Sequence, residues 1–525
     1  MITKKTLFIL FLAALIAVGC AGSKTPEHTT FQRNYYQIFV GSFYDSDGDG
    51  TGDLQGIVHK LDYLNDPQGK DSLGITGIWL TPINPSPTYH KYDVTDYYSI
   101  DPAFGTMEDF ELLITEANAR NIDVIIDLVI NHTSSLHPWF LAALEEIESG
   151  REPHYRNFYN FVEERSGSGF HPTVGGLYYE AHFWSEMPDL NMDSLPLREE
   201  IAKIARFWLE KGVAGFRLDA AMHIYNSQRQ NLDFWTWFVD TCKEINIEIN
   251  EGIFHNVDAI QNKSFIPKER LFLVGEVWSN EVEILPYFET GLALFNFPFS
   301  GHDGTINKAL NTGNGERLAS EMERYDREIR KRNPDGINCL FLSNHDTGRS
   351  AGFIPDPDKR KLAAAIYLMI PGNPFIYYGE EIGMTGSGID ENKRTAMFWS
   401  ATDQAGITKN PVDATNDKTP EEGVAEQLTD PESLLNYYRA ILALKATQPD
   451  IFSGEVTKID VENTGICAIR TGNVIIMHNL TDSSIEISLS EINVSLSGFV
   501  SPTGTDASES GGTLTLPPYA SAVLS

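Results

Sequence analysis

The stretch that decides the fold is a short apolar run that ends in charged and polar residues, GFRLDAAMH at residues 215–223. Comparable runs, rich in apolar and β-branched residues, lie at residues 36–40, 77–80, 124–129, 271–274, 292–295, 338–342 and 375–378. Most are followed by a helical pattern, such as the one at residues 197–211 with apolar residues on one face. Near-continuous apolar strands that alternate with helices indicate a parallel sheet covered on both faces. The sequence therefore predicts an α/β protein built on a (β/α)8 TIM barrel.

Two segments do not fit the barrel repeat. Residues 133–193 separate the third predicted strand from the next helix, far more than the roughly 12–15 residues beyond which loops are usually functional. We predict a small inserted domain there, beside the site. After the helical pattern at residues 433–446, short β-rich runs separated by turn residues indicate a C-terminal antiparallel β-sandwich over residues 447–525. The barrel is then predicted to comprise residues 31–132 and 194–446.

Composition excludes several classes of protein. The chain has 525 residues, of which 42% are hydrophobic, so it can form a large core. Its 40 Lys and Arg against 73 Asp and Glu give a net charge of −33, which would repel a nucleic acid. An acidic surface either keeps the protein soluble or reflects a saline habitat. We expect a monomer that does not bind nucleic acid.

The N-terminus has the layout of a signal peptide over residues 1–20. Two lysines precede an apolar run at residues 7–18, and a small residue, Gly19, follows. The four residues that end at Cys20 resemble a bacterial lipobox, in which the cysteine becomes the lipidated first residue; the alternative is an ordinary cleaved signal. Residues 21–30 are polar and are predicted to be a linker. We therefore expect an exported, extracellular or cell-envelope protein whose membrane contact is an anchor at Cys20.

Charged residues follow the predicted strands at the end where barrel enzymes carry their chemistry. A period of two along a strand puts Arg217 and Asp219 on the same face, where the guanidinium would keep the carboxylate ionised and oriented, as a nucleophile requires. The next strand ends at Glu276 among bulky apolar residues. Burial there would raise the pKa of the carboxyl group and make it a proton donor.

Two further strand ends carry histidines. The predicted third strand runs into Asn131 and His132, and the seventh into Asn344, His345 and Asp346. A single histidine of this kind would more often be structural. A pair of carboxyl groups beside histidines and aromatic residues, however, is the machinery of glycoside hydrolysis.

These motifs resemble those of the α-amylase family of glycoside hydrolases, family thirteen, over nearly the whole chain after the linker. The fifth family motif is MPDLN at residues 187–191, in the predicted inserted domain. The resemblance implies that Asp219 is the nucleophile, Glu276 the general acid/base and Asp346 a third carboxylate that grips the sugar hydroxyls. It also assigns sugar-binding roles to further residues, namely Arg217, His132, His345 and Tyr92, with Tyr92 stacking under the ring.

The resemblance implies a retaining double displacement on α-1,4-glucosidic bonds of starch and maltooligosaccharides. Departures from the family bear on the substrate. Tyr89 and His90 replace the pair that closes the pocket of exo-acting relatives, which favours an endo-acting enzyme, and Met222 stands where many amylases have a lysine. RTAMFW at residues 394–399 resembles a signature of the oligoglucosidase branch and makes Arg394 a candidate substrate contact.

Two alternatives remain open. A maltooligosaccharide- or cyclodextrin-degrading enzyme, or a transglycosylase, would share all the catalytic residues. A glycan-binding protein on an inactive barrel would have no need of the nucleophile and proton donor, so the intact Asp219, Glu276 and Asp346 argue against it.

The acidic run DSDGDGTGD at residues 45–53 predicts a calcium site. Oxygen donors alternate with tight glycine turns, as in the first half of an EF-hand loop but without the distal glutamate. We expect calcium to be bound by Asp45, Asp47, Asp49, the Thr51 carbonyl and Asp53. The resemblance adds a second calcium position, held by Asn131, Asp189 and the carbonyl of His223.

Overall fold

The computed structural model describes residues 33–69, 71–165, 167–255, 271–416, 420–490, 492 and 494–525. The predicted signal peptide, Cys20 and the linker lie outside these residues. None of the described helices is long and apolar enough to span a membrane.

Eight parallel strands form the barrel, as the sequence predicts. Their hydrogen-bonded order is β10-β9-β8-β7-β3-β2-β1-β11. Backbone bonds close the ring, because the N–H of Phe375 donates to the carbonyl of Leu340 at 2.7 Å. The strands are β1 (Tyr35–Ile38), β2 (Gly77–Leu80), β3 (Asp123–Leu128), β7 (Gly215–Leu218), β8 (Phe272–Gly275), β9 (Ala293–Phe295), β10 (Asn338–Cys339) and β11 (Phe375–Tyr377).

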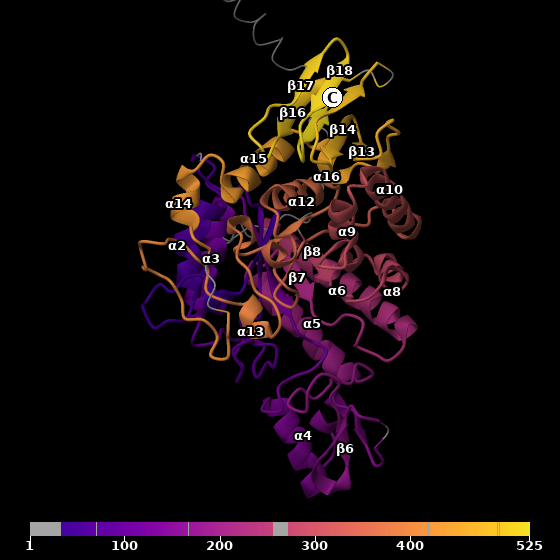
Figure 1. The fold of residues 1–525 in the computed structure, drawn as a ribbon. Helices are drawn as coiled ribbons and strands as arrows, with labels where there is room; N and C mark the ends of the chain where they lie inside the picture. The colour runs from indigo at the N-terminus through magenta and orange to yellow at the C-terminus, as the bar shows by residue number, and fades with distance from the viewer. Residues whose placement is uncertain are drawn as a thin grey trace, which may run out of the picture. The chain divides into compact units, whose positions relative to one another are not determined.

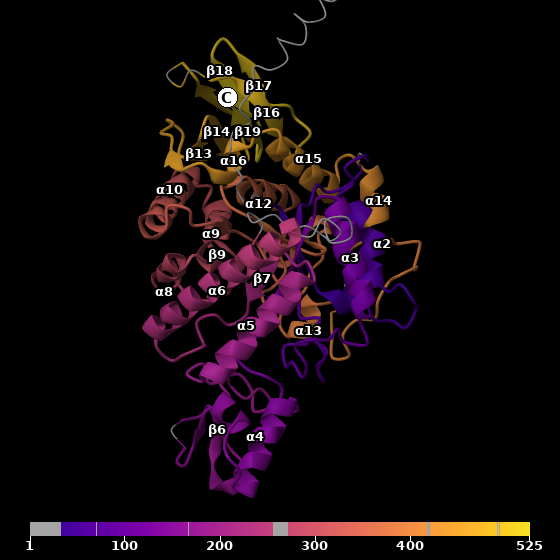
Figure 2. The same cartoon turned by 180° about the vertical axis from the view of Figure 1, so that it is seen from behind.

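Helices flank the barrel strands (Figures 1 and 2). The predicted helix over residues 197–211 is observed as α5 (Leu195–Glu210), and the one over residues 433–446 as α15 (Leu434–Ala446), capped by the Ser433 hydroxyl. The remaining described α-helices of the barrel are α2 (Leu54–Leu64), α3 (Met107–Ala119), α6 (Gln228–His255), α8 (Glu281–Ile284), α9 (Thr305–Thr312), α10 (Gly315–Arg332), α11 (Ser350–Phe353), α12 (Pro357–Met369), α13 (Asp390–Lys393) and α14 (Val424–Thr429).

Strand register brings the charged residues of neighbouring strands level with one another. In the β3–β7 pair Asp127 lies opposite Arg217, and in the β7–β8 pair Arg217 lies opposite Val274. The close approach of β7 and β8 explains the glycine that opens the motif: Gly215 has φ +146°, and a Cβ there would lie 1.9 Å from the Phe272 carbonyl oxygen. Register thus delivers Arg217 to the rim beside the ends of β3 and β8.

The segment after β3 forms a small structure of its own. It contains α4 (Pro138–Ser149) and a three-stranded antiparallel sheet of β4 (Phe161–Val162), β6 (Tyr178–Glu180) and β5 (Phe170–Pro172). The N–H of Leu190 donates to the carbonyl of Asn131 at 2.9 Å, so the returning chain is fastened to the end of β3. That bond places the inserted segment directly beside the strand ends.

The chain ends in two antiparallel sheets, as predicted. One has five strands in the order β12-β13-β14-β19-β16 and the other has three in the order β15-β18-β17. Side chains from both sheets, such as Ile475 and Leu514, share one core. The other face of the larger sheet packs on the barrel, where the Cys467 sulfur lies 3.9 Å from that of Met322 in α10. The strands are β12 (Thr457–Lys458), β13 (Ile466–Thr471), β14 (Val474–Asn479), β15 (Ile485–Ser488), β16 (Leu496–Val500), β17 (Ser508–Ser510), β18 (Thr513–Leu516), β19 (Ser521–Leu524), and α16 (Asp450–Ser453) precedes them.

The burial patterns of two strands explain the contrast in their sequences. β14 is buried along its whole length because it is covered on both sides, and its first four residues, 474–477, are a continuous apolar run. β15 alternates buried and exposed residues because one face meets solvent.

Candidate active site

A cavity of about 470 Å³ gathers the residues predicted from the strand ends. Asp219 and Glu276 follow β7 and β8, and Asp346 follows β10. The same cavity is lined by Tyr92, His132 and Arg394. Arg217 and His345 lie directly behind this lining, 1% and 0% exposed.

Arg217 is the electrostatic centre of the site. Its Nη1 lies 2.6 Å from Asp219 Oδ1 and 2.8 Å from Asp127 Oδ1, and its Nη2 lies 2.6 Å from Glu276 Oε1. Burial by itself would lower the pKa of Arg217, but its electrostatic interactions with Asp127 and Glu276 hold it well above its usual value. One permanently charged guanidinium therefore binds three carboxyl groups from three strands.

Glu276 is held as a proton donor. Burial raises its pKa to about 8, with Asp219 and Asp346 adding to the rise while Arg217 opposes it. Its Oε2 accepts a hydrogen bond from the backbone N–H of Ala220 at 3.2 Å. Ala220 has a positive φ of 46°, rare for a residue other than glycine, and this turn aims its N–H at Glu276.

Asp346 is held as an anion. Its Oδ1 lies 2.8 Å from Arg394 Nη2 and its Oδ2 lies 3.0 Å from His345 Nε2. Burial opposes ionisation of Asp346, yet its polar and cationic neighbours, Arg394 among them, keep its pKa below the usual value. Burial lowers the pKa of His345 to about 3, so that ring is neutral at pH 7 and its contribution to Asp346 is a hydrogen bond.

Tyr92 connects the histidines to the charged cluster. Its ring stacks on His345 with centroids 5.4 Å apart and an angle of 10° between the planes. Its hydroxyl donates to Asp127 Oδ2 at 3.0 Å, and its backbone carbonyl lies 3.1 Å from His132 Nε2. The preceding residue, Lys91, has a positive φ of 67°, and its Nζ forms an ion pair with Asp101 Oδ2 at 2.7 Å. This ion pair therefore anchors the loop that carries Tyr92.

Several residues that line or support the site were not identified from the sequence. Exposed aromatic rings belong to Phe183 and Trp184 of the inserted segment and to Trp278, two residues after Glu276. Trp278 stacks on Phe297 with centroids 5.5 Å apart. A sequence does not show which aromatic residues stay exposed, although the spacing from Glu276 could have indicated Trp278.

A second group of missed residues is buried in the barrel. Asp127 lies within the predicted strand at residues 124–129, and it accepts hydrogen bonds from Trp79 Nε1 at 3.2 Å and from Tyr92. Gln37, read only as part of an apolar strand, lies 2.8 Å from His345 Nδ1. A polar side chain in the middle of a buried strand was the available signal, since buried polar groups need partners.

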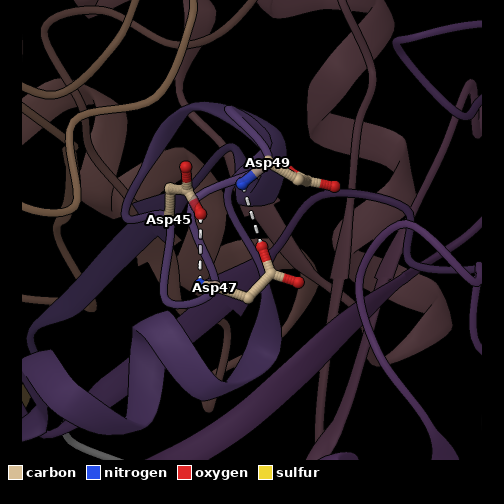
Figure 3. A group of neighbouring side chains, drawn as sticks. All are labelled: Asp45, Asp47 and Asp49. Carbon is tan, nitrogen blue, oxygen red and sulfur yellow. Dashed lines mark hydrogen bonds between the residues drawn. The ribbon is translucent and has the colours of Figure 1, made fainter.

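The acidic loop brings three of its four carboxylates together. Ligand atoms of Asp45, Asp47 and Asp49 all lie within 4.8 Å of one another (Figure 3). Asp45 Oδ1 accepts the N–H of Asp47 and Asp47 Oδ1 accepts that of Asp49, which sets the tight turns. The carboxylate of Asp53 instead caps α2 through the Gly56 N–H at 2.7 Å and binds the Ser46 hydroxyl. Like charges held this close are a suitable set of oxygen donors for calcium.

The residues named for a second calcium also lie together. The side-chain amide of Asn131 donates to the carbonyl of His223 at 2.5 Å. Asp189 is 6% exposed; its Oδ2 accepts the His182 N–H, and its Oδ1 has no hydrogen-bond partner among the described residues. Burial raises the pKa of Asp189 to about 7.

Comparison with known proteins identifies the family. The model of the alpha amylase catalytic domain matches residues 37–454. The chain belongs to the α-amylase family. It is 39% identical over 489 residues to Alpha-amylase 3 of Dictyoglomus thermophilum, covering 91% of this chain and 90% of that protein. The structure of Eubacterium rectale Amy13B matches with a TM-score of 0.86 at 38% identity, covering 94% of this chain and 96% of that one.

Not every relative in the α-amylase family carries the name amylase. Oligo-1,6-glucosidase of Heyndrickxia coagulans is 31% identical, covering 80% of this chain and 85% of that protein. The fold and the enzyme class predicted from the sequence, a glycoside hydrolase of the α-amylase type, are confirmed. Because the relatives differ in the bond that their names specify, the substrate of this enzyme has to be argued from the residues that line its own cavity.

Proposed function

We propose that this α-amylase-family enzyme is a retaining, endo-acting hydrolase of α-1,4-glucosidic bonds in starch and maltooligosaccharides. The observation that carries the proposal is the pairing on Arg217 of Asp219 with Glu276, whose pKa burial raises to about 8. Two carboxyl groups on one guanidinium, of which burial keeps Glu276 as an acid, can supply a nucleophile and a proton donor to the same bond.

The reaction follows from these positions. Asp219 attacks the anomeric carbon while Glu276 gives its proton to the leaving oxygen, which breaks the glucosidic bond and forms a glycosyl ester on Asp219. Glu276, now a carboxylate, takes a proton from the water that cleaves this ester, and so both residues return to their starting states. Asp346, held by His345 and Arg394, binds hydroxyls of the same ring, with His132 and Tyr92 beside the ring.

The rim of the cavity favours a polymeric substrate. Trp278 is 53% exposed, and Phe183 and Trp184 are 47% and 48% exposed. Exposed rings around a cavity that holds carboxyl groups are suited to stacking on the apolar faces of successive sugars. The name of the Dictyoglomus thermophilum relative, an alpha-amylase, supports the same substrate class.

One observation favours a second candidate, a maltooligosaccharide- or cyclodextrin-degrading enzyme or transglycosylase. Met222 lines the cavity where many family members have a lysine on the leaving-group side. An apolar surface there would bind water poorly and leave room for a sugar acceptor. The oligo-1,6-glucosidase relative also acts, by its name, on short substrates.

The products released from soluble starch and from maltoheptaose decide between these functions. With the chain lacking residues 1–20, we expect mixed short maltooligosaccharides and a rapid fall in starch viscosity. Glucose or maltose alone with viscosity nearly unchanged would contradict endo action, and products longer than the maltoheptaose supplied would indicate transglycosylation. The Asp219→Asn variant is the control for contaminating activity.

We also propose that the loop at residues 45–53 binds calcium through Asp45, Asp47, Asp49 and the Thr51 carbonyl, with Asp53 at its edge. The three clustered carboxylates support this site, because a divalent cation relieves their mutual repulsion. Calcium would supply positive charge that stabilises the loop. The loop is joined to the segment that follows Arg394, since the N–H of Lys409 donates to the carbonyl of Gly50 at 2.8 Å.

Finally, we propose that the protein is exported as a monomeric lipoprotein anchored at Cys20. The support is the basic, apolar and small-residue order of residues 1–20. Metabolic labelling with palmitate tests it: the intact chain should incorporate label and a Cys20→Ala variant should not. Label in both would refute the anchor, and its absence from both would favour an ordinary cleaved signal.

A further inference from the structure

We propose that Gln37, on the first barrel strand, is a positioning residue that holds His345 in the tautomer whose Nε2 hydrogen points at Asp346. The inference rests on the proposed function, because it concerns how that site is kept in order. Gln37 does not line the cavity, and it would act on the sugar only through His345 and the Asp346 carboxylate that His345 meets.

The geometry is a short buried relay. Gln37 Nε2 lies 2.8 Å from His345 Nδ1, and His345 Nε2 lies 3.0 Å from Asp346 Oδ2. The two side chains that begin the relay, Gln37 and His345, are 1% and 0% exposed. Tyr92 stacks on one face of the imidazole and Trp79 meets it edge-on at 5.5 Å, so the ring has little freedom to turn.

The direction of each hydrogen bond is dictated by the charges. His345 Nε2 faces two groups, Asp346 Oδ2 and the Tyr92 hydroxyl. Asp346 is an anion paired with Arg394 and the Tyr92 hydroxyl gives its own hydrogen to Asp127, so both groups are acceptors and Nε2 must carry the hydrogen. The ring is neutral at pH 7 and has one hydrogen to place, which leaves Nδ1 as an acceptor. Among the described residues, the side chain that meets this acceptor is the Gln37 amide, which must therefore present its N–H.

Strand position explains why a glutamine is needed. Gln37 lies opposite Trp79 of β2 and Tyr377 of β11 in the sheet register, between the otherwise apolar residues of β1. An unpaired amide in such a place would be costly, and the bond to His345 supplies its partner. An anionic glutamate could not donate to Nδ1. An apolar residue would leave that nitrogen buried without a partner.

The first test is the nitrogen chemical shifts of His345 in protein labelled at histidine, assigned by comparison with a His345→Asn variant. We expect hydrogen on Nε2 and a bare Nδ1 in the wild-type protein, and hydrogen on both nitrogens in Gln37→Glu, because the new carboxylate would attract a second proton. Hydrogen on Nδ1 in the wild type, or unchanged His345 shifts in Gln37→Glu, would overturn the proposal.

The second test is the pH dependence of kcat on maltoheptaose. Gln37→Met should lower kcat about ten-fold with KM little changed and the profile unaltered in shape. In Gln37→Glu, kcat should depend on one more proton, the one shared by His345 and the new carboxylate. The basic limb of the kcat profile should then become steeper or move to lower pH. Equal, pH-independent losses in both variants would show a merely structural role.

Gln427→Glu is the matched control, because Gln427 is also a buried glutamine and its amide donates to backbone carbonyls away from the cavity. It should leave the pH profile unchanged. If Gln37→Glu does not fold, the wild-type shifts and Gln37→Met still decide the question. If the wild-type protein cleaves no glucan, the proposed function fails, while the nitrogen shifts still report on Gln37.

Discussion

Asp219 and Glu276 are 7% and 8% exposed and come from different strands, whereas Asp47 and Asp49 are exposed and lie two residues apart in one loop. In the cavity, both carboxyl groups contact one buried guanidinium, and burial raises the pKa of Glu276 to about 8. In the loop, short turns hold carboxylates together beside water.

The difference between the cavity and the loop shows where a protein can adjust the pKa of a carboxyl group. A buried carboxyl group responds strongly to its neighbours because little water screens them, so a protein can set its pKa for chemistry. Exposed carboxylates stay ionised and gain most from an added cation. The cavity is therefore suited to proton transfer and the loop to metal binding.

The largest effect that would sharpen this contrast is expected from Asp219→Asn. The change removes the nucleophile but keeps the shape of the side chain, so kcat on maltoheptaose should fall by about 10⁴-fold or more. Thermal unfolding should shift little, because the amide can still meet Arg217. Turnover close to that of the wild type in this variant would refute the assignment of the nucleophile.

Glu276→Gln should produce the next largest loss. Wild-type kcat should decline as pH rises through about 8, where burial places the pKa of Glu276, because the acid must carry its proton to act. The variant should lose about 10²–10⁴-fold on maltoheptaose and much less on an aryl maltoside, whose leaving group needs no proton.

Stability gives an independent check on Glu276. Its pKa rises from 4.5 in the unfolded chain to about 8 in the folded protein, so the wild type loses stability as pH rises between these values. Glu276→Gln should escape this loss and melt at or above the wild-type temperature near pH 9. A lower melting temperature for the variant at that pH would argue that burial does not penalise the ionised form.

A moderate effect is expected from removing calcium. Binding to the folded state at 100 times the dissociation constant contributes about 2.7 kcal/mol, so chelation should lower the melting temperature by a few degrees. Asp47→Asn should reduce that shift. Asp335→Asn, at an exposed carboxylate outside the loop, should preserve it. Identical melting curves with and without chelator would contradict the site.

The smallest effect is expected from salt. Raising ionic strength from about 0.1 M to about 1 M shortens the Debye length from about 10 Å to about 3 Å. Calcium affinity at the exposed loop should weaken several-fold by calorimetry, while the basic limb of kcat should stay where it was. A large shift of that limb would show that salt reaches the catalytic carboxyl groups and would remove the contrast between the two regions.

Much of the fold could be predicted because local patterns matched it. The eight apolar runs all became barrel strands, and the predicted β7 run at residues 215–218 agrees with the observed strand at both ends. The period of two also placed Arg217 beside Asp219 correctly. The position of a strand and the side on which its residues lie depend on residues that are close together in the chain, and a sequence shows those directly.

Other features of the site depend on pairing across strands. The register of β3 against β7 brings Asp127 to Arg217, and β1 carries Gln37 to His345 although the two residues are far apart in sequence. The loop shows the same limit on a smaller scale. Asp53 continues the spacing of the acidic run, yet its carboxylate caps α2 because the helix begins at the next residue.

The sequence by itself determined the alternation of strands and helices, the set of acidic and histidine residues at the strand ends, and the acidic loop, because each is written in consecutive residues. Only the tertiary structure decided that Glu276 is buried deeply enough to keep its proton and which side chains face the two nitrogens of His345, because both depend on burial and on groups brought in from other strands. Proximity in space, and the loss of water that comes with it, turns a set of ordinary side chains into a site where acid and base are distinct.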